Sequence, residues 1–345
     1  MYRPMIHRLT LAALSLLLSS RLIAYDFANI ATSHIVPAYQ QLAASTQALN
    51  QAAQAYCAQP AESSLQTLQD AHVQAFLAWQ GAQHLRFGPI QYLSREHRLQ
   101  LWPDKRGTVS KHLRVLLEDA ALTQPDFDIS AKSVAVQGFS ALEQLLFAEQ
   151  APDGKRCTLL QAITANLQQI GSNLLHDWQD GDQAFARYFS APAVDNPLFT
   201  SQRELAGQLL NSLHTQLEFI QTQKLGRPLG SGPERARGRR AEAWRSGASL
   251  AAIERNLQAC RALYQVSFAG ELPAELDTRI AQAFDAAIAQ LQRIAPPLAQ
   301  SVERPAQWQE IQQLQQQLNG LRELLARDLA QALDLSLGFN SLDGD

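Results

Sequence analysis

The stretch ESSLQTLQDAHVQAFLAWQGAQHLRF, residues 62–87, decides the fold class because its apolar side chains recur every three or four residues. At that spacing, side chains lie above one another on one face of an α-helix. The segment therefore predicts an amphipathic helix with a buried apolar face, and it places His72 in a core. The face continues into Gln83 and Arg86, and its main members are Leu65, Leu68, His72, Phe76 and Trp79.

The same periodicity recurs along the rest of the chain, and no segment shows the sustained alternation that is typical of a β-strand. Residues 311–325 repeat with nearly heptad spacing. A coiled coil and a final bundle helix both fit this spacing, and we favour the bundle helix because the stripe covers only a few heptads. The predicted helices cover residues 35–55, 63–85, 105–122, 130–148, 159–178, 201–224, 242–264, 273–295 and 305–335.

Two segments rich in Gly and Pro, residues 180–200 and 226–240, interrupt the helical pattern. The first is the better domain boundary because it leaves enough helices on each side for one bundle apiece. We therefore predict an all-α protein with two helical-bundle domains. The predicted divisions are a signal peptide over residues 1–24, an N-terminal bundle over 25–190 and a C-terminal bundle over 191–345.

The composition supports a folded helical protein. Of the 345 residues, 46% are hydrophobic and 18% are charged, which is enough to build a substantial core. Only 17 Gly and 15 Pro are present, which favours helices over a β-fold rich in turns. Lys and Arg number 29 against 32 Asp and Glu, a formal charge of −3. Because nucleic-acid binding relies on an excess of basic residues, we expect no nucleic-acid partner.

Residues 1–24 have the layout of a secretory signal peptide. Arg3, His7 and Arg8 precede an apolar run over residues 9–18, and the small residue Ala24 follows at a cleavage position. The run is too short to hold the chain across a bilayer. We expect cleavage and export to the periplasm, with no membrane-spanning segment left in the mature chain. Loss of the segment, which also holds Arg21, leaves 26 basic against 32 acidic residues and a charge of −6.

Export would place the three cysteines in an oxidising compartment, where one pair and one free thiol are the simplest arrangement. Cys57 lies at the end of a predicted helix. Cys157 follows the turn over residues 152–154, so a disulfide is sterically easy at both positions. We predict a disulfide between Cys57 and Cys157, with Cys260 in a core.

The predicted helix over residues 130–148 is apolar on nearly every side, so we expect it to be central and buried. A buried carboxylate at Glu143 needs a hydrogen-bonding or cationic partner, a metal, or a proton. Ser140 lies one turn earlier on the same face. Two interpretations fit Glu143: a structural carboxylate bonded to another helix, or an acid that binds a ligand.

A second polar cluster opens the predicted helix over residues 242–264. An acid, a guanidinium and two hydroxyls could line a cleft there, or they could cap the helix. The arginines of residues 226–240 could meet an acidic partner or anionic lipid, or could form a solvated connector. The residues of the cluster are Glu242, Trp244, Arg245, Ser246 and Ser249.

Several dispersed motifs follow one another in order: FGP (87–89), WPD (102–104), GFSALEQLLF (138–147), RC (156–157), KLGRPL (224–229) and AEAWRS (241–246). Together they resemble the imelysin family from about residue 30 to near the C-terminus. The resemblance implies a periplasmic or surface-exposed all-α protein with two bundles that is linked to bacterial iron uptake. One branch of that family is classed as metallopeptidases. The resemblance also nominates residues beside these motifs as walls of a cleft: Trp79, Arg86, Trp102 and Asp104.

The match departs from the family at its hallmark, a Gly-x-His-x-x-Glu helix whose His and Glu share one side. Ser140 stands at the histidine position, and a neutral hydroxyl is a poor ligand for zinc or ferrous iron. The family's Glu-Ser pair reads Glu242-Ala243 here. HExxH, GxSxG and Walker motifs are absent. His214 and Glu218 share a helix face, but such pairs are common by chance. Metal binding, by iron or another divalent ion, is therefore doubtful.

The resemblance and the buried acid at Glu143 together imply a non-enzymatic, exported protein of imelysin type. We expect it to assist iron acquisition by binding a ligand or partner in a cleft where Glu143 and Glu242 converge. One alternative is a metallopeptidase, which needs three protein ligands and a base. The other is an interaction scaffold that binds an iron-uptake or redox partner in the periplasm.

Overall fold

The computed structural model describes residues 25–149, 151–181 and 184–337 and shows an all-α protein, which confirms the predicted fold class. The predicted signal peptide lies outside the described residues. Within the described residues there is no β-strand, and no helix is long and apolar enough to cross a membrane. The long helices are α2 (Val36–Ala58), α3 (Glu62–Ala82), α5 (Thr108–Glu118), α7 (Gly154–Gln179), α9 (Gln202–Phe219), α11 (Ser249–Ser267), α12 (Ala274–Arg293) and α14 (Pro305–Glu323).

Short helical segments connect and extend these helices. The α-helical ones are α1 (Phe27–Ile30), α4 (Arg95–Leu99), α6 (Phe139–Leu146), α8 (Phe185–Ser190), α10 (Gly226–Leu229), α13 (Leu298–Ser301) and α15 (Ala330–Ala332). The 3-10 turns are η2 (Gly88–Ser94), η3 (Ala120–Thr123), η4 (Ile129–Ala131), η5 (Val134–Val136), η7 (Pro233–Arg235), η8 (Gly238–Arg240) and η9 (Ala269–Glu271). The π-helical turns are η1 (Ala31–Ile35), η6 (Ile220–Leu225) and η10 (Leu324–Leu329).

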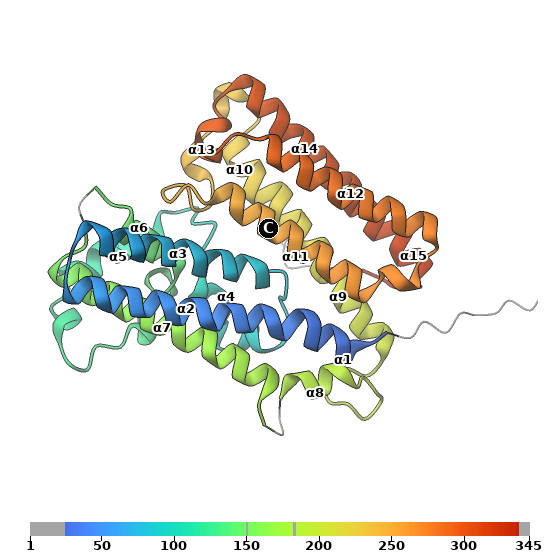
Figure 1. Cartoon of the computed structure of the whole chain (residues 1–345), viewed down its shortest axis with the longest axis horizontal. Helices are drawn as coiled ribbons and strands as arrows, with labels where there is room; N and C mark the ends of the chain where they lie inside the picture. The colour runs from blue at the N-terminus through green and yellow to red at the C-terminus, as the bar shows by residue number, and fades with distance from the viewer. Residues whose placement is uncertain (1–24, 150, 182–183, 338–345) are drawn as a thin grey trace, which may run out of the picture.

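The N-terminal helices α2, α3 and α7 pack side by side as one group (Figure 1). The stripe that begins at residue 65 faces inward, with Leu68, His72, Phe76 and Trp79 buried. Because each side chain follows the last by three or four residues, one face of α3 contributes continuously to the core. The predicted helix over residues 63–85 is therefore confirmed, although it ends at Ala82.

The C-terminal helices α9, α11, α12 and α14 form a second group, drawn from yellow to red in Figure 1. The near-heptad stripe of α14 is buried against this group, at Ile311, Leu314, Leu318 and Leu321. This packing matches the bundle helix that we favoured. The predicted division between residues 190 and 191 falls between α8 and α9, and the domain limits stay a prediction.

The two groups share one continuous hydrophobic core, and α3 packs against α11 across their boundary. A Cβ added to Gly81 of α3 would lie in ordinary van der Waals contact with the side chain of Arg255 on α11. The groups therefore meet along a packed helix pair rather than through a mobile linker, and a site between them can be held in a fixed geometry.

The predicted single helix over residues 130–148 is wrong. The turns η4 and η5 occupy its first half, and only α6 is a true helix. Gly138 explains the break: a Cβ at this position would overlap the backbone carbonyl oxygens of Leu99 and Arg98. The extended backbone at Gly138, with a φ of −131°, brings the start of α6 directly against the C-terminal end of α4.

The predicted helix over residues 242–264 begins later than expected, at Ser249. The preceding residues form a turn with positive φ values of 49° at Ala243 and 73° at Gly247. Glycine adopts such a value without steric cost, whereas a helix requires negative φ throughout. This segment, residues 241–248, is called the 241–248 turn below.

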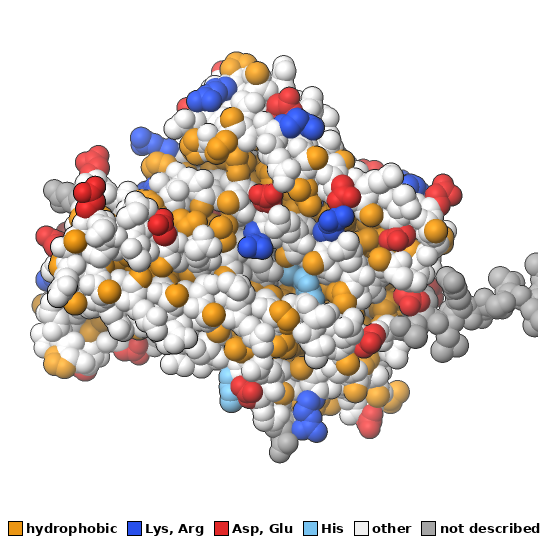
Figure 2. Space-filling model, in the orientation of Figure 1, with side chains coloured by type: hydrophobic (Ala, Val, Ile, Leu, Met, Phe, Trp, Pro, Cys, Tyr) orange, Lys and Arg blue, Asp and Glu red, His pale blue; other side chains and the backbone are white. Residues whose placement is uncertain are grey.

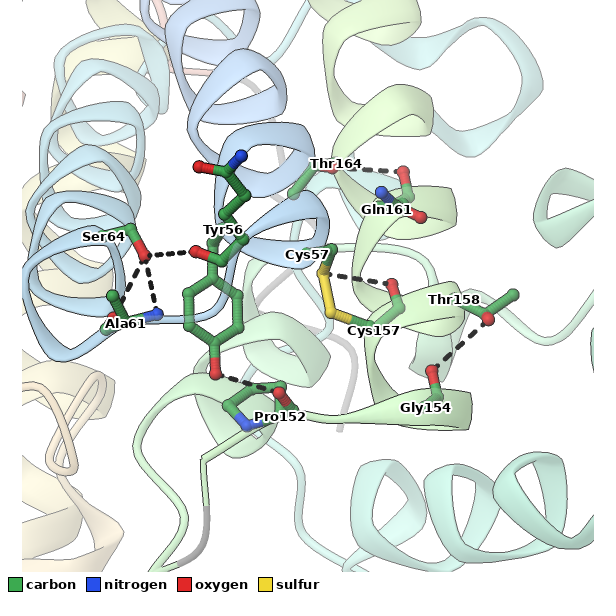
Figure 3. Close-up of a disulfide and its surroundings, with 11 residues drawn as sticks. Tyr56, Cys57, Ala61, Ser64, Pro152, Gly154, Cys157, Thr158, Gln161 and Thr164 are labelled. Atoms are coloured by element: carbon green, nitrogen blue, oxygen red, sulfur yellow. Dashed lines mark hydrogen bonds between the residues drawn. A yellow bond between two sulfur atoms is a disulfide. The ribbon is translucent and has the colours of Figure 1, made fainter.

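A disulfide between Cys57 and Cys157 joins the end of α2 to the first turn of α7 (Figure 3). This is the pair suggested by the sequence, and it closes a separation of 100 residues. Beside it, the Tyr56 hydroxyl donates a hydrogen bond to the carbonyl oxygen of Pro152 at 2.9 Å. Cys260 is buried on α11, where desolvation raises the pKa of its thiol to about 12.

Candidate ligand-binding cavity between the two helix groups

A cavity of about 370 Å³ lies where the N-terminal and C-terminal helix groups meet. Small-molecule sites typically have volumes of about 300–1,000 Å³. Helices α3, α5 and α6 and the segment between α4 and α5 supply one part of the wall. Residues between α10 and α11, together with Arg227 of α10, supply the rest. The polar and aromatic lining residues include Gln100, Trp102, Asp104, Ser110, Ser140, Glu143, Gln144, Arg227, Arg239, Arg240, Trp244 and Arg245.

Glu143 is the acid that links α6 to the 241–248 turn. Glu143 is buried, with only 7% of its surface exposed to solvent. One carboxylate oxygen, Oε1, accepts hydrogen bonds from the backbone N–H groups of Arg245 (3.1 Å) and Ser246 (3.0 Å). It also accepts one from the Ser246 hydroxyl at 3.0 Å. Desolvation raises the pKa of Glu143, while the bonds from Ser246 and the charge of Arg245 oppose that rise. The buried acid thus has the partners it requires.

Ser140 lies on the same helix but does not pair with Glu143. Its hydroxyl donates a hydrogen bond to the carbonyl oxygen of Leu101 at 3.0 Å. In the part of the chain that the structure describes, no three His, Cys, Asp or Glu side chains are grouped closely enough to hold a metal. A zinc or iron site needs such a set of ligands. The residues of the degenerate motif therefore do not fit a metal ion.

Glu242 does not converge with Glu143 in the cavity, contrary to the expectation from sequence. Its side chain points into the protein interior, where Oε2 forms an ion pair with Lys224 Nζ at 2.8 Å. Both side chains are almost fully buried, with 1% exposure for Lys224 and 2% for Glu242. A buried carboxylate is stabilised by a cation at this distance, which explains why Glu242 turns away from the polar cavity.

Lys224 is the centre of a polar network that sequence reasoning missed. Its ammonium group also donates hydrogen bonds to Gln80 and Asn256. Gln100 donates to Glu242 Oε1 at 2.8 Å, so the network joins residues of both helix groups. Burial lowers the pKa of Lys224, and the charge of Glu242 opposes this effect. The KLGRPL motif at residues 224–229 contains this lysine, but nothing in the motif indicates that the side chain is buried.

The wall residues nominated by the resemblance separate into two sets. Trp102 and Asp104 line the cavity, and Asp104 accepts hydrogen bonds from two backbone N–H groups at the start of α5, those of Thr108 (2.8 Å) and Val109 (2.9 Å). Trp79 and Arg86 lie outside the lining. Trp79 donates to the buried Gln100, and Arg86 pairs with Glu96 at 3.2 Å.

The cluster before α11 is also divided. Trp244 and Arg245 line the cavity, whereas Ser246 and Ser249 have structural partners. Ser246 binds Glu143, and the Ser249 hydroxyl donates to the carbonyl oxygen of Glu242. Neither serine caps α11, because its N-cap residue is Ala248 and, within the described residues, no side chain hydrogen-bonds to the free N–H groups there. The cleft interpretation describes the tryptophan and the arginine.

The arginine-rich segment at residues 226–240 is more than a solvated connector. Arg227, Arg239 and Arg240 line the cavity together with Arg245. We call these four residues the arginine cluster. On the face shown in Figure 2, basic and acidic side chains are interspersed. The collection of four guanidinium groups at one cavity therefore stands out from a chain whose formal charge is −3.

His84 and His72, the second of which the sequence placed in a core, have defined surroundings. His84 lies with its Nε2 at 2.8 Å from Nε2 of His34. His72 is buried beside the rings of Phe76 and Phe139 and reaches the cavity wall. Desolvation lowers the pKa of His72 to about 3, and it also lowers the pKa of His84 well below its ordinary value. Both imidazoles are therefore neutral in the folded protein.

The neutral state of His72 predicts lower stability in mild acid. Below about pH 6.5 the unfolded chain binds a proton at this histidine that the folded protein does not, so the free energy of unfolding falls as pH falls. We expect His72 to account for a loss of about 2 kcal/mol between about pH 7.5 and about pH 5. Urea unfolding of the wild type and of His72→Leu at both pH values measures this, since the variant should lose less stability. Equal losses in the two proteins would contradict it.

The comparisons with known proteins agree with this architecture. The family model for imelysin matches residues 35–325. Iron-regulated protein A of Synechococcus elongatus is 27% identical over 199 residues, and the match covers 56% of this chain. It spans about half, 52%, of that curated relative.

Two solved structures share the fold. An imelysin-like protein from Psychrobacter arcticum superposes with a TM-score of 0.74 at 22% identity, over 91% of this chain and 96% of that one. A protein assigned as an iron-regulated protein A precursor from Parabacteroides distasonis gives a TM-score of 0.69 at 13% identity, over 87% and 92%. The imelysin family model, in addition, matches most of the sequence itself. The chain belongs to the imelysin family.

Proposed function

We propose that this protein is exported to the periplasm and assists iron acquisition by binding a ligand in the cavity between its helix groups, without catalysing a reaction. The observation that carries the proposal is the cavity itself. It is about 370 Å³ in volume, and its wall combines two tryptophans with several polar and charged side chains. Aromatic walls with a few placed polar groups are typical of small-molecule sites.

Binding is favoured over peptide hydrolysis because the acid and the hydroxyl of the degenerate motif already have structural partners. Glu143 Oε1 accepts three hydrogen bonds from the 241–248 turn. The Ser140 hydroxyl donates to a backbone carbonyl. A metallopeptidase of this family type would need an imidazole at residue 140 and further ligands.

Two further observations support the iron-related role and the location. The curated relative is named an iron-regulated protein, and so is one of the proteins with the same fold. The first 24 residues have the charged, apolar and small-residue order of a cleaved signal. Export and the link to iron are therefore tested together in living cells.

The test is growth of a gene-deletion strain in iron-limited medium, complemented with Ser110→Trp or Lys111→Trp. Ser110 is exposed in the first turn of α5 and lines the cavity, so an indole there blocks it without entering the core. Lys111 is its exposed neighbour outside the lining. At equal periplasmic amounts, only Ser110→Trp should fail to restore growth. Full growth with Ser110→Trp, or recovery of the protein only from the cytoplasm, would overturn the proposal.

The peptidase alternative has its own measurement. Purified protein is incubated with unfolded peptide substrates, with and without a chelator. We expect no cleavage above a blank. Proteolysis that the chelator removes, and that Glu143→Gln also lacks, would replace binding with catalysis as the function.

A further inference from the structure

We propose that the cavity binds a small multivalent oxyanion, the chemistry shared by polycarboxylates and polyphosphates, rather than a bare metal cation. The inference rests on the proposed ligand-binding function and specifies the class of ligand. Its basis is the arginine cluster, which brings four guanidinium groups to one cavity wall from three separate stretches of α10, η8 and the 241–248 turn.

The charge of the wall favours an anion. Against the four arginines, the lining holds only two carboxylates, Glu143 and Asp104. Both acids accept hydrogen bonds from backbone N–H groups, which occupy their oxygen atoms but leave the negative charges in place. The wall therefore keeps a formal excess of two positive charges. A bare cation would be repelled by this wall, whereas an anion would be attracted to it.

The guanidinium groups have room for a ligand. Among the residues that the structure describes, none of the recorded ion pairs involves a member of the arginine cluster. The Nε atom of Arg227 is buried and has no hydrogen-bond partner. Burial and the nearby charge of Arg240 lower the pKa of Arg227. Arg227 and Arg245 are partly buried, whereas Arg239 and Arg240 are exposed. A bound oxyanion would offset the cost of holding the two partly buried charges near the other two.

Two members of the cluster are already oriented. The guanidinium carbon of Arg245 lies 4.4 Å from the centre of the Trp244 ring, and that of Arg239 lies 5.4 Å from it. Stacking on an indole restricts a guanidinium while leaving its N–H groups free to bind carboxylate or phosphate oxygens in pairs. A preorganised donor loses less conformational entropy on binding. Because several such donors face one small volume, a ligand with two or more anionic groups uses them best.

The link to iron gives this chemistry a purpose. Multivalent oxyanions with hard oxygen donors hold iron in solution, and the resulting chelates can carry net negative charge. An arginine-lined cavity then receives iron through its chelator, and the protein itself supplies no metal ligands. This explains how a member of an iron-linked family can work with Ser140 in place of the motif histidine.

The test is calorimetric titration of the purified protein with citrate, pyrophosphate, ferric citrate and Mn²⁺. The binding-site variant is Arg239→Gln/Arg245→Gln. Its control is Arg235→Gln/Arg237→Gln, which removes the same charge from exposed positions of the same segment outside the cavity. Thermal melting of each variant checks that the fold is intact.

Citrate should bind the wild type, and the binding-site variant should weaken it by about tenfold or more for each guanidinium removed. The control variant should bind citrate like the wild type, and added salt should weaken binding in both. Tighter binding of citrate than of pyrophosphate identifies a carboxylate ligand, and the reverse identifies a phosphate.

Saturable binding of Mn²⁺ with no binding of any oxyanion at millimolar concentration would overturn the inference, as would equal citrate affinity in the two double variants. The growth defect expected of Ser110→Trp does not depend on either of these titration results, because it tests whether the cavity is used at all. Failure of the oxyanion inference is therefore distinguishable from failure of the proposed function.

Discussion

Replacing Lys224 by Met should lower the free energy of unfolding by about 3–5 kcal/mol, because removal of one partner from a buried ion pair leaves the other charge uncompensated. Glu242 would then hold a carboxylate in the interior with a hydrogen bond from the neutral amide of Gln100 and without the ammonium group that pairs with it. The oxygen atoms of Gln80 and Asn256 would also lose their donor. Urea unfolding followed by circular dichroism measures the loss.

A double variant separates the lost pair from simple disruption of packing. Lys224→Met/Glu242→Gln removes both charges, and it should recover a substantial part of the stability that Lys224→Met loses. Lys111→Met serves as the matched control because Lys111 is exposed. It should change the stability by no more than about 0.5 kcal/mol. A loss below about 1 kcal/mol for Lys224→Met would contradict the importance of the buried pair.

This network matters to the cavity as well as to the fold. It anchors Glu242 at the start of the 241–248 turn, two residues before Trp244. Glu143 holds the same turn from the other side through Arg245 and Ser246. The 241–248 turn, which carries Trp244 and Arg245 of the cavity wall, is thus held by Lys224 at one point and by Glu143 at another.

Replacing Gly138 by Ala should lower the free energy of unfolding by about 4 kcal/mol or more, a size expected only of severe steric or polar disruption. The added Cβ would overlap the carbonyl oxygens of Leu99 and Arg98, and these are backbone atoms that cannot rotate away. The φ of −131° at Gly138 is accessible to alanine, so the cost comes from contact and not from backbone strain. Displacement of α6 would also move Ser140 and Glu143.

Gly320→Ala provides the matched control. Gly320 lies inside α14, and no atom lies within 4 Å of the position where its Cβ would be built. Alanine at an open helical position should leave stability unchanged or raise it by up to about 1 kcal/mol. Thermal and urea unfolding of both variants give the comparison. If Gly138→Ala were as stable as Gly320→Ala, the close approach of α6 to residues 98–99 would be incorrect.

Much of the fold was predictable because helical periodicity is a local property. The stripe over residues 65–79 and the stripe over residues 311–321 both record which face is buried, and the structure buries them. The break at Gly138 was not predictable in this way. It depends on a backbone segment about 40 residues earlier in the chain, which no local pattern reveals.

The candidate site was predictable only in part. The need of Glu143 for partners followed from its apolar neighbours, and the structure provides hydrogen bonds from the 241–248 turn. The direction of the Glu242 side chain depends on its ion pair with Lys224. Because the two residues lie on different elements, no regular spacing in the sequence indicates that they pair. The same limit applies to the arginines, because a charged segment has the same kind of sequence whether its side chains face water or a cavity.

An anionic ligand bound at the arginine cluster should be visible in a crystal structure of the protein grown with citrate. We expect citrate in the cavity beside Trp244, with carboxylate oxygens within hydrogen-bonding distance of at least two guanidinium groups of the cluster. An ordered arginine cluster with no citrate at millimolar concentration, or citrate bound elsewhere on the protein, would contradict this expectation.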